Sequence, residues 1–464
     1  MEQSKDFLGR EPLGRLLARL SAPTVAAQLI NMLYNIVDRI YIGHIPVTGA
    51  LALTGLGVCM PIILAVSAFA ALIGYGGAPR ASIFLGRKDE KAAEQVLGGC
   101  FTALLAVSAV LTAVLLLFNR RLLLAFGASG ETIGYALRYM NVYALGTVFV
   151  QLTLGMNTFI TAQGFAKTGM YSVLIGAALN IVLDPLFIFA FRMGVAGAAW
   201  ATILSQAVSC AWVLLFLFGK KTILRIRRAN LRPRAAVLWP CVKLGTGNFV
   251  MQISESVITV CFNSSLLKYG GNTAVGAMTI LYSVMQFALL PLQGLAQGAQ
   301  PILSYNFGAR LRGRVEQTFR LLMKVSLGYS AALWALIMLL PRAFAGIFTS
   351  NADLVAFTAR ALRVYAASLG LFGAQVACQM TFTSIGDAGA SVAAAVMRKF
   401  VLLIPLIFLL PRLWTANPTF AVYLAEPIAD ACAVTFTVLL FRRNFRRRLD
   451  ENDRGSAPAP LGQD

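Results

Sequence analysis

The chain has 464 residues, of which 58% are hydrophobic and only 13% are charged. A soluble protein of this length would carry about a quarter charged residues, so the composition excludes an ordinary soluble enzyme and indicates a membrane protein. The formal net charge of +21 does not point to nucleic acid as a partner, because no basic stripe is interleaved with aromatic residues.

Apolar residues gather into about a dozen stretches, each long enough to cross a hydrocarbon core of about 30 Å as a helix. Because lipid offers no partner to backbone polar groups, helices are the expected structure of these stretches. We predict an all-α polytopic membrane protein with twelve transmembrane helices in two pseudo-symmetric six-helix lobes. In chain order the predicted spans are 16–42, 52–78, 93–118, 136–160, 168–191, 195–218, 242–268, 276–304, 318–340, 360–382, 391–411 and 417–441.

These spans divide the chain into an N-terminal arm (1–15), a first lobe (16–218), an inter-lobe loop (219–241), a second lobe (242–441) and a basic, disordered tail (442–464). Lysine and arginine cluster in the arm, the inter-lobe loop and the tail. The positive-inside rule therefore places both termini and the inter-lobe loop in the cytoplasm, and the protein in the cytoplasmic membrane.

The two predicted lobes are similar in sequence when the chain is aligned with itself at a constant offset. At an offset of 222, Pro79 matches Pro301, Gly86 matches Gly308 and Gly164 matches Gly386. Six helices per repeat is an even number, so the halves are parallel repeats about an axis along the membrane normal. Such proteins usually hold their substrate between the halves.

Acidic residues inside the predicted spans need a physical reason, because an ionisable group at the bilayer centre costs about 3 kcal/mol on insertion scales. Asp38 lies in the first helix, and Asp184 lies in the fifth, four residues after Asn180 and on the same helix face. Pro185 then frees backbone carbonyls beside Asp184. Two neighbouring carboxylates in a low dielectric would bind Na⁺ or share a proton, so we predict a cation or proton site in the first lobe.

A position near the membrane interface is the alternative for each of these acids. The predicted first-lobe acids could lie there and pair with Arg39 or Arg192. Glu255 in the seventh helix is a less certain second-lobe candidate, and an interface position fits Glu426 and Asp430 best, because both fall early in the last helix. At the repeat offset, Asp38, Asn180 and Asp184 correspond to Val260, Leu402 and Leu406, so we expect the site in the first lobe only.

Neutral polar residues predict a central cavity lined by amides and aromatics, which would suit bulky organic cations. Each of them alone also fits ordinary helix packing. Pro23 marks a hinge or a static bend in the first helix. The seven cysteines and the single His44 show no metal-ligand spacing, so we expect no cofactor and no metal site apart from Na⁺. The cavity candidates are Gln28, Asn31, Tyr34, Asn35, Asn157, Gln252, Gln286 and Gln379.

The chain resembles the MATE (multidrug and toxic compound extrusion) family over about residues 10–445. The resemblance is carried by NIVLDPLFIF around Asp184, by GVAGAAWATILSQ (194–206), and by the helix-ending segments around Gly86 and Gly308. It is strongest toward the DinF/MepA-like branch of prokaryotic exporters. It implies twelve helices in two lobes and export of cationic, lipophilic compounds in exchange for Na⁺ or H⁺.

The resemblance also implies site residues. The family's first-lobe cation site falls on Asp38, Asn180, Asp184 and Thr202, and Pro23 matches the proline at which the family's first helix bends. Another branch uses a glutamate on the seventh helix and an aspartate on the tenth. Glu255 matches that glutamate, but residues 360–382 contain no acid, which leaves a second site incomplete.

We therefore predict a monomeric secondary antiporter that works by rocking of two lobes. The sequence has no Walker-type phosphate loop, so we expect no ATP coupling. It shows neither a nucleophile–base pair nor a metal constellation, so we expect no enzyme. The alternative is a lipid-linked oligosaccharide flippase of the wider superfamily, which would have basic residues in its central cavity. The candidates, Arg398 and Lys399, are expected near the cytoplasmic end of the eleventh helix.

Overall fold

The computed structural model describes residues 6–46 and 48–454, and within these ranges the chain is helical and contains no strand. The first half of the chain runs as α1 (Phe7–Arg10), α2 (Leu13–Gly43), α3 (Gly49–Gly86), α4 (Glu90–Ala125), α5 (Ile133–Leu145), α6 (Thr147–Ala162), α7 (Ala166–Pro185), the π-helical turn η1 (Leu186–Ala190) and α8 (Val195–Phe218). The second half runs as the 3₁₀ turn η2 (Arg228–Asn230), α9 (Ala235–Gly308), α10 (Arg312–Leu339), α11 (Pro341–Gly346), α12 (Ala352–Tyr365), α13 (Leu369–Ser384), α14 (Ala388–Val396), the π-helical segment η3 (Met397–Leu403), α15 (Ile404–Leu413) and α16 (Pro418–Asp453).

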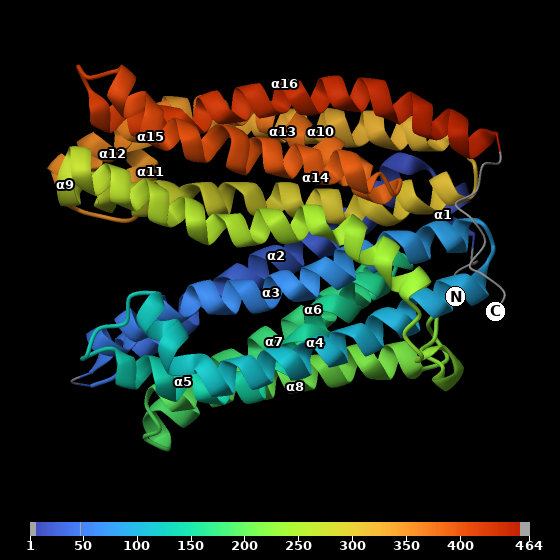
Figure 1. The fold of residues 1–464 in the computed structure, drawn as a ribbon, viewed down its shortest axis with the longest axis horizontal. Helices are drawn as coiled ribbons and strands as arrows, with labels where there is room; N and C mark the ends of the chain where they lie inside the picture. Colours follow the sequence, from blue (N-terminus) through green and yellow to red (C-terminus); the bar gives the residue numbers. More distant parts are fainter. Residues whose placement is uncertain (1–5, 47, 455–464) are drawn as a thin grey trace.

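The described helices make twelve membrane spans. Nine helices are long and apolar enough to cross a membrane, and two broken pairs, α5 with α6 and α12 with α13, raise the number to 11; their bends are 58° and 49°. Helix α9 has 74 residues and contains a left-handed turn at Gly271 (φ 63°), so it is two spans joined in a hairpin, which makes the twelfth (Figure 1). The predicted fold class is confirmed.

Large apolar side chains cover the outside of the bundle. Leu117 is 77% exposed, Leu215 is 74% exposed and Leu339 is 76% exposed. Such extensive apolar exposure is rare on soluble monomers and is expected where lipid is the solvent. The chain is therefore a multi-pass membrane protein.

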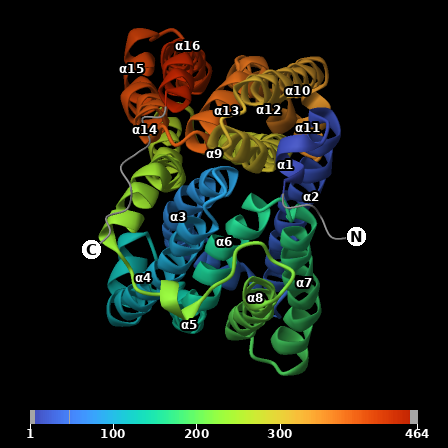
Figure 2. The same cartoon turned by 90° about the vertical axis from the view of Figure 1, so that its right-hand side faces the viewer.

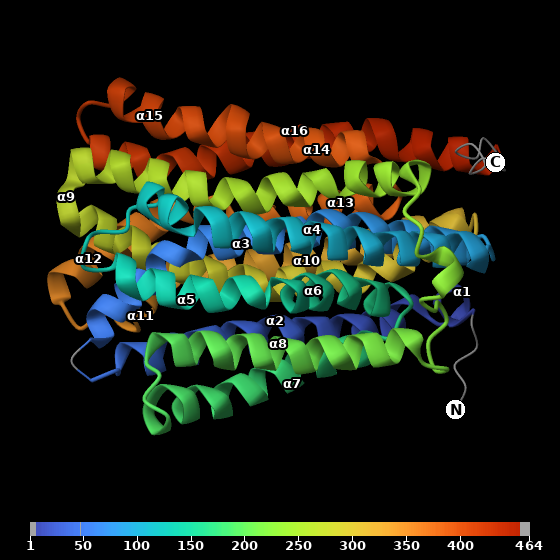
Figure 3. The same ribbon diagram turned by 60° about the horizontal axis from the view of Figure 1, so that its bottom comes forward.

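The two halves form two bundles that are joined at one end only. Helices α3–α8 and α9–α16 occupy opposite sides of the molecule (Figure 2), and most run along its long axis (Figure 3). At the end that carries α1 and the last turns of α16, here called the terminal end, one hydrophobic core combines residues of both lobes, among them Phe159, Ile302 and Phe382. Toward the opposite end each lobe has a core of its own. The ribbons accordingly diverge away from the terminal end (Figure 1).

The internal repeat is visible in local geometry as well as in sequence. The Ser82 hydroxyl donates to the carbonyl of Ala162 (2.6 Å), and the Ser304 hydroxyl donates to the carbonyl of Ser384 (2.8 Å). Both partners in the second bond are the repeat equivalents of those in the first. Gly164 and Gly386 both have positive φ, 88° and 78°. The predicted duplication is confirmed by these matched bonds and turns.

Helices α3 and α9 cross at the terminal end with backbone against backbone. A Cβ atom on Gly86 would lie 2.0 Å from the carbonyl oxygen of Tyr305, and one on Gly308 would lie 2.0 Å from that of Ile83. The two contacts are related by the repeat, because Gly86 is equivalent to Gly308 and Ile83 to Tyr305. Only glycine permits this approach, so these two positions bring the lobes together.

The first helix of each lobe has a different register from the rest of the repeat. Gly76 packs against Cys241, and its equivalent Gly298 packs against Ser21, so Ser21 and Cys241 correspond at an offset of 220. Asp38 therefore corresponds to Ile258 rather than to Val260. The equivalent residue is apolar at either offset, so no copy of Asp38 exists in the second lobe.

The termini and the inter-lobe loop are more ordered than the sequence indicated. Helix α9 begins at Ala235, and the loop before it buries Leu224 and Ile226, so it is not simply a solvated connector. The tail was predicted to be disordered from residue 442, but α16 continues to Asp453 because Phe445 and Leu449 are buried on one face. Residues 455–464 lie outside the described part of the chain.

Candidate functional site

The predicted first-lobe acids meet between α2 and α7. Asp38 is 8% exposed and Asp184 is fully buried, although the two are far apart in sequence. Helices α2 and α7 pack against each other, and the two carboxyl groups lie within hydrogen-bonding reach of one another. The side-chain amide of Asn180 donates to Oδ1 of Asp184 at 3.3 Å. The i, i+4 spacing that predicted a shared face for Asn180 and Asp184 is thus realised.

Each of these three side chains keeps one oxygen without a hydrogen-bond partner. Within the described residues, Asp38 Oδ1, Asn180 Oδ1 and Asp184 Oδ2 are buried and unpartnered. Buried polar atoms are almost always satisfied, so three such oxygens on neighbouring residues mark a place that a cation, a proton or water would occupy. Carboxylate and amide oxygens are hard ligands suited to a small cation, and two adjacent carboxylates could equally share a proton.

The basic neighbours do not neutralise this cluster. Arg39 follows Asp38 in the chain, but its side chain is exposed, as is that of Arg192. In the described part of the chain neither arginine makes an ion pair with Asp38 or Asp184, whose remaining oxygens stay unpartnered. The alternative in which the acids pair with these arginines at the interface is therefore wrong for this structure.

Hydroxyl groups complete the surroundings of the acids. The Tyr34 phenol lies on α2 near Asp38 and Asp184, and Tyr139 of α5 lies near Asp38 with its hydroxyl beside that of Thr202 on α8. The Thr202 hydroxyl donates to the carbonyl of Ala198 at 3.0 Å. Tyr139 was not predicted. The repeat could have pointed to this segment, because neighbouring Tyr143 matches Tyr365.

Local backbone irregularity follows the acid. Pro185 has no backbone N–H, so the helical ladder is broken after Asp184, and the chain continues as the π-helical turn η1. Such π-turns are frequent at functional sites, where they re-aim side chains. The proline thus explains why the regular helix α7 ends directly after the acid.

The second lobe contains a buried ion network that the sequence did not reveal. The Arg398 guanidinium binds Asp430 at 2.6 Å and Glu426 at 3.2 Å, and it stacks 4.6 Å from the centre of the Phe372 ring. Arg398 is 6% exposed and both acids are equally buried. Glu426 and Asp430 do not lie at the interface as predicted, because their cationic partner comes from η3.

Lys399, next to Arg398, binds the predicted second-lobe acid. Its ammonium lies 2.7 Å from Glu255 Oε1, and the hydroxyl of Tyr282 donates to the other carboxylate oxygen. Lys399 is 3% exposed, whereas the Glu255 side chain is 40% exposed. Lys399 and Arg398 lie near the middle of the span Ala388–Leu413, not near its end as predicted. Both are paired with acids, so they do not form the free basic cavity that a flippase would need.

A polar link joins the lobes near the pseudo-two-fold axis. The amide of Gln28 on α2 donates to Gln297 on α9 at 3.1 Å, and the Gln297 amide donates to the hydroxyl of Tyr75 on α3 at 3.1 Å. Tyr75 and Gln297 are equivalent residues of the repeat, which is why they can meet at the axis. Gln28 was predicted; Tyr75 and Gln297 were not.

The remaining cavity candidates differ in how far they are buried. Asn31 and Gln286 are exposed, and Asn35, Asn157 and Gln252 are half-buried. Gln379 is buried and donates to the carbonyl of Ser391 at 3.0 Å, as Asn157 does to that of Gly169 at 3.3 Å. These equivalent bonds tie neighbouring helices, so Gln379 packs helices rather than lining an open space.

The fold and the buried acidic cluster define a two-lobed, multi-pass membrane transporter. The chain matches the profile of the MatE family over residues 23–186 and 248–409, which is more than half of its length, and it belongs to that family. The predicted resemblance is confirmed.

Relatives and solved structures agree with this assignment. The chain is 24% identical to the multidrug export protein MepA of Staphylococcus aureus strain MSSA476 over 94% of its own length and 95% of that protein. It is similar, at 24% identity and a TM-score of 0.89, to a multidrug resistance MATE family transporter solved in an outward-facing conformation, covering 97% of this chain and 99% of that one. A MATE structure in a bent conformation gives a TM-score of 0.90 at 24% identity, covering 98% of this chain and 100% of that one.

Proposed function

We propose that this protein is a secondary multidrug exporter that expels cationic, lipophilic compounds in exchange for Na⁺ or H⁺. The observation that carries the proposal is the buried pair Asp38 and Asp184: one carboxylate oxygen of each, and the amide oxygen of Asn180, have no hydrogen-bond partner among the described residues. The name of the staphylococcal relative, a multidrug export protein, supports the assignment of export.

The coupling is energetically sufficient. A membrane potential of 100 mV supplies about 2.3 kcal/mol for each charge that moves inward. For a neutral substrate this free energy corresponds to a gradient of about 50-fold before any ion gradient is counted. A monovalent cation that leaves cancels the inward charge, so its export would be driven by the concentration gradient of the ion at the Asp38–Asp184 pair or by a second ion.

Alternating access would use the two-lobed architecture. The lobes share a core at the terminal end and have separate cores toward the opposite end. With the basic termini in the cytoplasm, as the charge distribution favours, this arrangement faces outward. Rocking of the lobes would close the outer end and separate Gly86 from Tyr305. Pro23, inside the continuous helix α2, is the proposed hinge in this movement.

The substrate would bind between the lobes, in the chain as a monomer. Gln28, Asn31, Tyr34, Asn35 and Gln252 offer amides and an aromatic ring in the halves that diverge from the terminal end. Substrate and ion would compete for the first lobe, because Tyr34 and Asn35 lie within one turn of Asp38 on α2.

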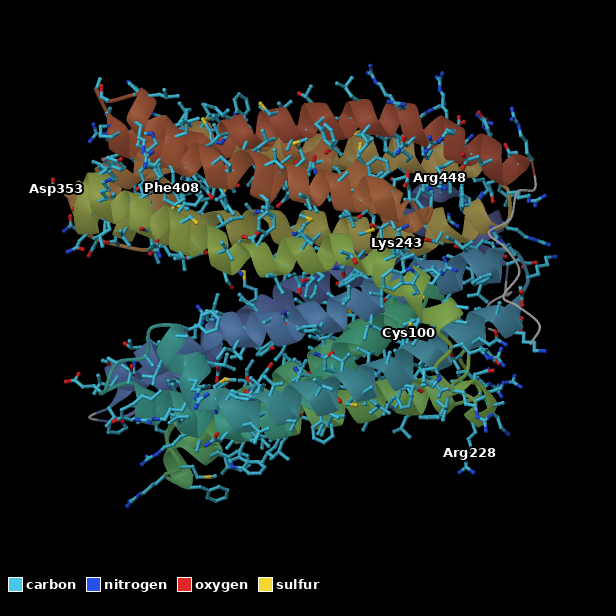
Figure 4. The ribbon with its side chains drawn as sticks, viewed as in Figure 1. Cys100, Arg228, Lys243, Asp353, Phe408 and Arg448 are labelled. Atoms are coloured by element: carbon cyan, nitrogen blue, oxygen red, sulfur yellow. The ribbon has the colours of Figure 1, made fainter. Side chains whose placement is uncertain are left out.

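An efflux assay tests the proposal. Wild type, Asp184→Asn and the control Asp353→Asn would be expressed in an efflux-deficient bacterium and loaded with ethidium. Asp353 is an exposed acid at the end of the molecule opposite the terminal end (Figure 4). We expect wild type and Asp353→Asn to export ethidium and Asp184→Asn to retain it. Export by Asp184→Asn at the wild-type rate would refute the coupling site, and no export by wild type would refute the function.

A further inference from the structure

A pocket of about 550 Å³ opens at the terminal end, where α3, α9 and α1 meet. Among the described residues, its lining includes four basic residues, Arg10, Arg87, Lys88 and Arg310, but only one acid, Asp6. The pocket is formed by both lobes, because Arg87 and Lys88 follow α3 and Arg310 follows α9. None of its lining residues belongs to the acidic cluster described above, which lies toward the C-terminal ends of α2 and α7.

Two of the basic residues are equivalent positions of the repeat. Lys88 corresponds to Arg310, and both have left-handed backbone conformations, with φ of 62° and 57°. Glycine is the usual residue where a helix ends in this conformation, because a Cβ atom disfavours it. A strained cation at both equivalent positions is an outlier that points to a function for the charge.

Among the described residues, few acids oppose the positive charge in the pocket. Asp6 pairs with Arg10 at 3.5 Å and accepts a hydrogen bond from Tyr305 at 3.0 Å. Arg87, Lys88 and Arg310 make no ion pair in the part of the chain that the structure describes. Nearby Asp89 uses its carboxylate to cap α4 through the backbone N–H of Ala92.

The crowding of cations is visible at Arg87. Partial burial lowers the pKa of its guanidinium, and the positive charges of Arg310 and Arg80 lower it further, while Asp89 opposes them. Like charges that are held together in this way are stabilised by a bound anion.

We propose that this pocket binds a phosphate group through Arg87, Lys88 and Arg310. The phosphate comes from the headgroup of an anionic phospholipid or from a free phosphate anion, since both present the same oxygens to guanidinium and ammonium groups. Because the ligands belong to both lobes, the bound phosphate favours the arrangement in which their terminal ends touch. Phosphate binding to this pocket does not require that the protein transports anything. Only an effect of the bound phosphate on export rests on the proposed function.

Binding is tested on the whole protein in nanodiscs at constant ionic strength. One arm titrates pyrophosphate into phosphatidylcholine nanodiscs, and the other replaces part of the phosphatidylcholine with phosphatidylglycerol. The readout is the midpoint of thermal unfolding. We expect a saturable rise with at least one probe, and a loss of about tenfold or more in apparent affinity for Lys88→Gln/Arg310→Gln. A response to phosphatidylglycerol alone identifies the lipid headgroup, and a response to pyrophosphate alone identifies a free phosphate.

Two further variants make the result specific. The control Arg228→Gln/Arg442→Gln removes the same amount of charge from two exposed arginines outside the pocket. Arg228 projects from the loop after α8 (Figure 4). We expect this control to bind the probes like wild type. Lys88→Gly/Arg310→Gly relieves the backbone strain, so we expect this variant to be more stable than wild type without ligand and still to lose binding. The proposal is overturned if neither probe gives a saturable shift, or if the control loses as much affinity as the pocket variants.

Discussion

The ammonium nitrogen of Lys399 lies 2.7 Å from Oε1 of Glu255, so the second lobe supplies an internal cation to its own acid. The first-lobe acids have no such partner among the described residues, and Asp38 and Asp184 each keep a buried, unpaired oxygen. The two lobes have the same helical architecture, but of these acids only that of the second lobe pairs with a cationic side chain in the described part of the chain. This difference favours ion exchange at the first lobe, whereas in the second lobe Arg398 and Lys399 each hold a fixed ion pair with its acids.

The Lys399–Glu255 pair should be energetically coupled. We expect Lys399→Gln to lower the free energy of unfolding by about 1–2 kcal/mol, less than the 3–5 kcal/mol typical of a fully buried pair, because Glu255 is 40% exposed. Adding Glu255→Gln should restore much of the loss. A double-mutant cycle by thermal unfolding in detergent measures the coupling, and strictly additive single effects would show that the pair contributes nothing.

Arg398 should be far less tolerant of replacement. Arg398→Gln leaves Glu426 and Asp430 buried without their cation, and we expect a loss of about 3–5 kcal/mol in the free energy of unfolding. Arg398→Lys keeps the charge but loses the planar fork that reaches both acids, so its loss should be smaller but measurable. Thermal unfolding of the purified variants provides the comparison. Equal stability of Arg398→Gln and wild type would contradict the network.

Asn180 should distinguish Na⁺ from H⁺ as the coupling ion. Asn180→Leu removes one unpaired oxygen and keeps both carboxylates. A Na⁺ ion needs several oxygen ligands, so its apparent affinity should fall about tenfold with the loss of one, whereas a proton shared by Asp38 and Asp184 needs no third ligand. Transport into inverted vesicles is measured once with a Na⁺ gradient and once with a pH gradient. The two experiments show how the transport rate of the variant depends on each ion. Unchanged drive by Na⁺ in the variant would argue against a Na⁺ site that includes Asn180.

The contact between Gly86 and Tyr305 should tolerate no side chain. Gly86→Ala places a Cβ atom 2.0 Å from a backbone oxygen, so the terminal ends must separate, and we expect a loss of about 1–3 kcal/mol. Gly57→Ala, in the same helix, meets nothing within 4 Å. It should be neutral or up to about 1 kcal/mol stabilising through helix propensity. The midpoint of thermal unfolding of both variants measures the difference; if Gly86→Ala matched Gly57→Ala, the helices would not be in backbone contact.

Much of the fold could be predicted because its signals are local. Long apolar stretches define the spans, and every one of the twelve has a helical counterpart in the described chain. The repeat is a comparison along the sequence, and Asn180 and Asp184 are placed on one face by the period of the helix. The family resemblance adds Asp38 and Thr202 to the same site.

The three-dimensional structure alone decided which distant side chains meet. Arg398 pairs with Glu426 and Asp430, which are 28 and 32 residues away in the sequence. Lys399 pairs with Glu255, which is 144 residues away. The helical spacing of residues in the sequence does not predict such pairings. They depend on which helices are neighbours and on how far each helix is rotated and shifted along its axis. The sequence alone determined a two-lobed membrane transporter with acids in its spans. Packing decided that the first-lobe acids have no cation of their own and that those of the second lobe do.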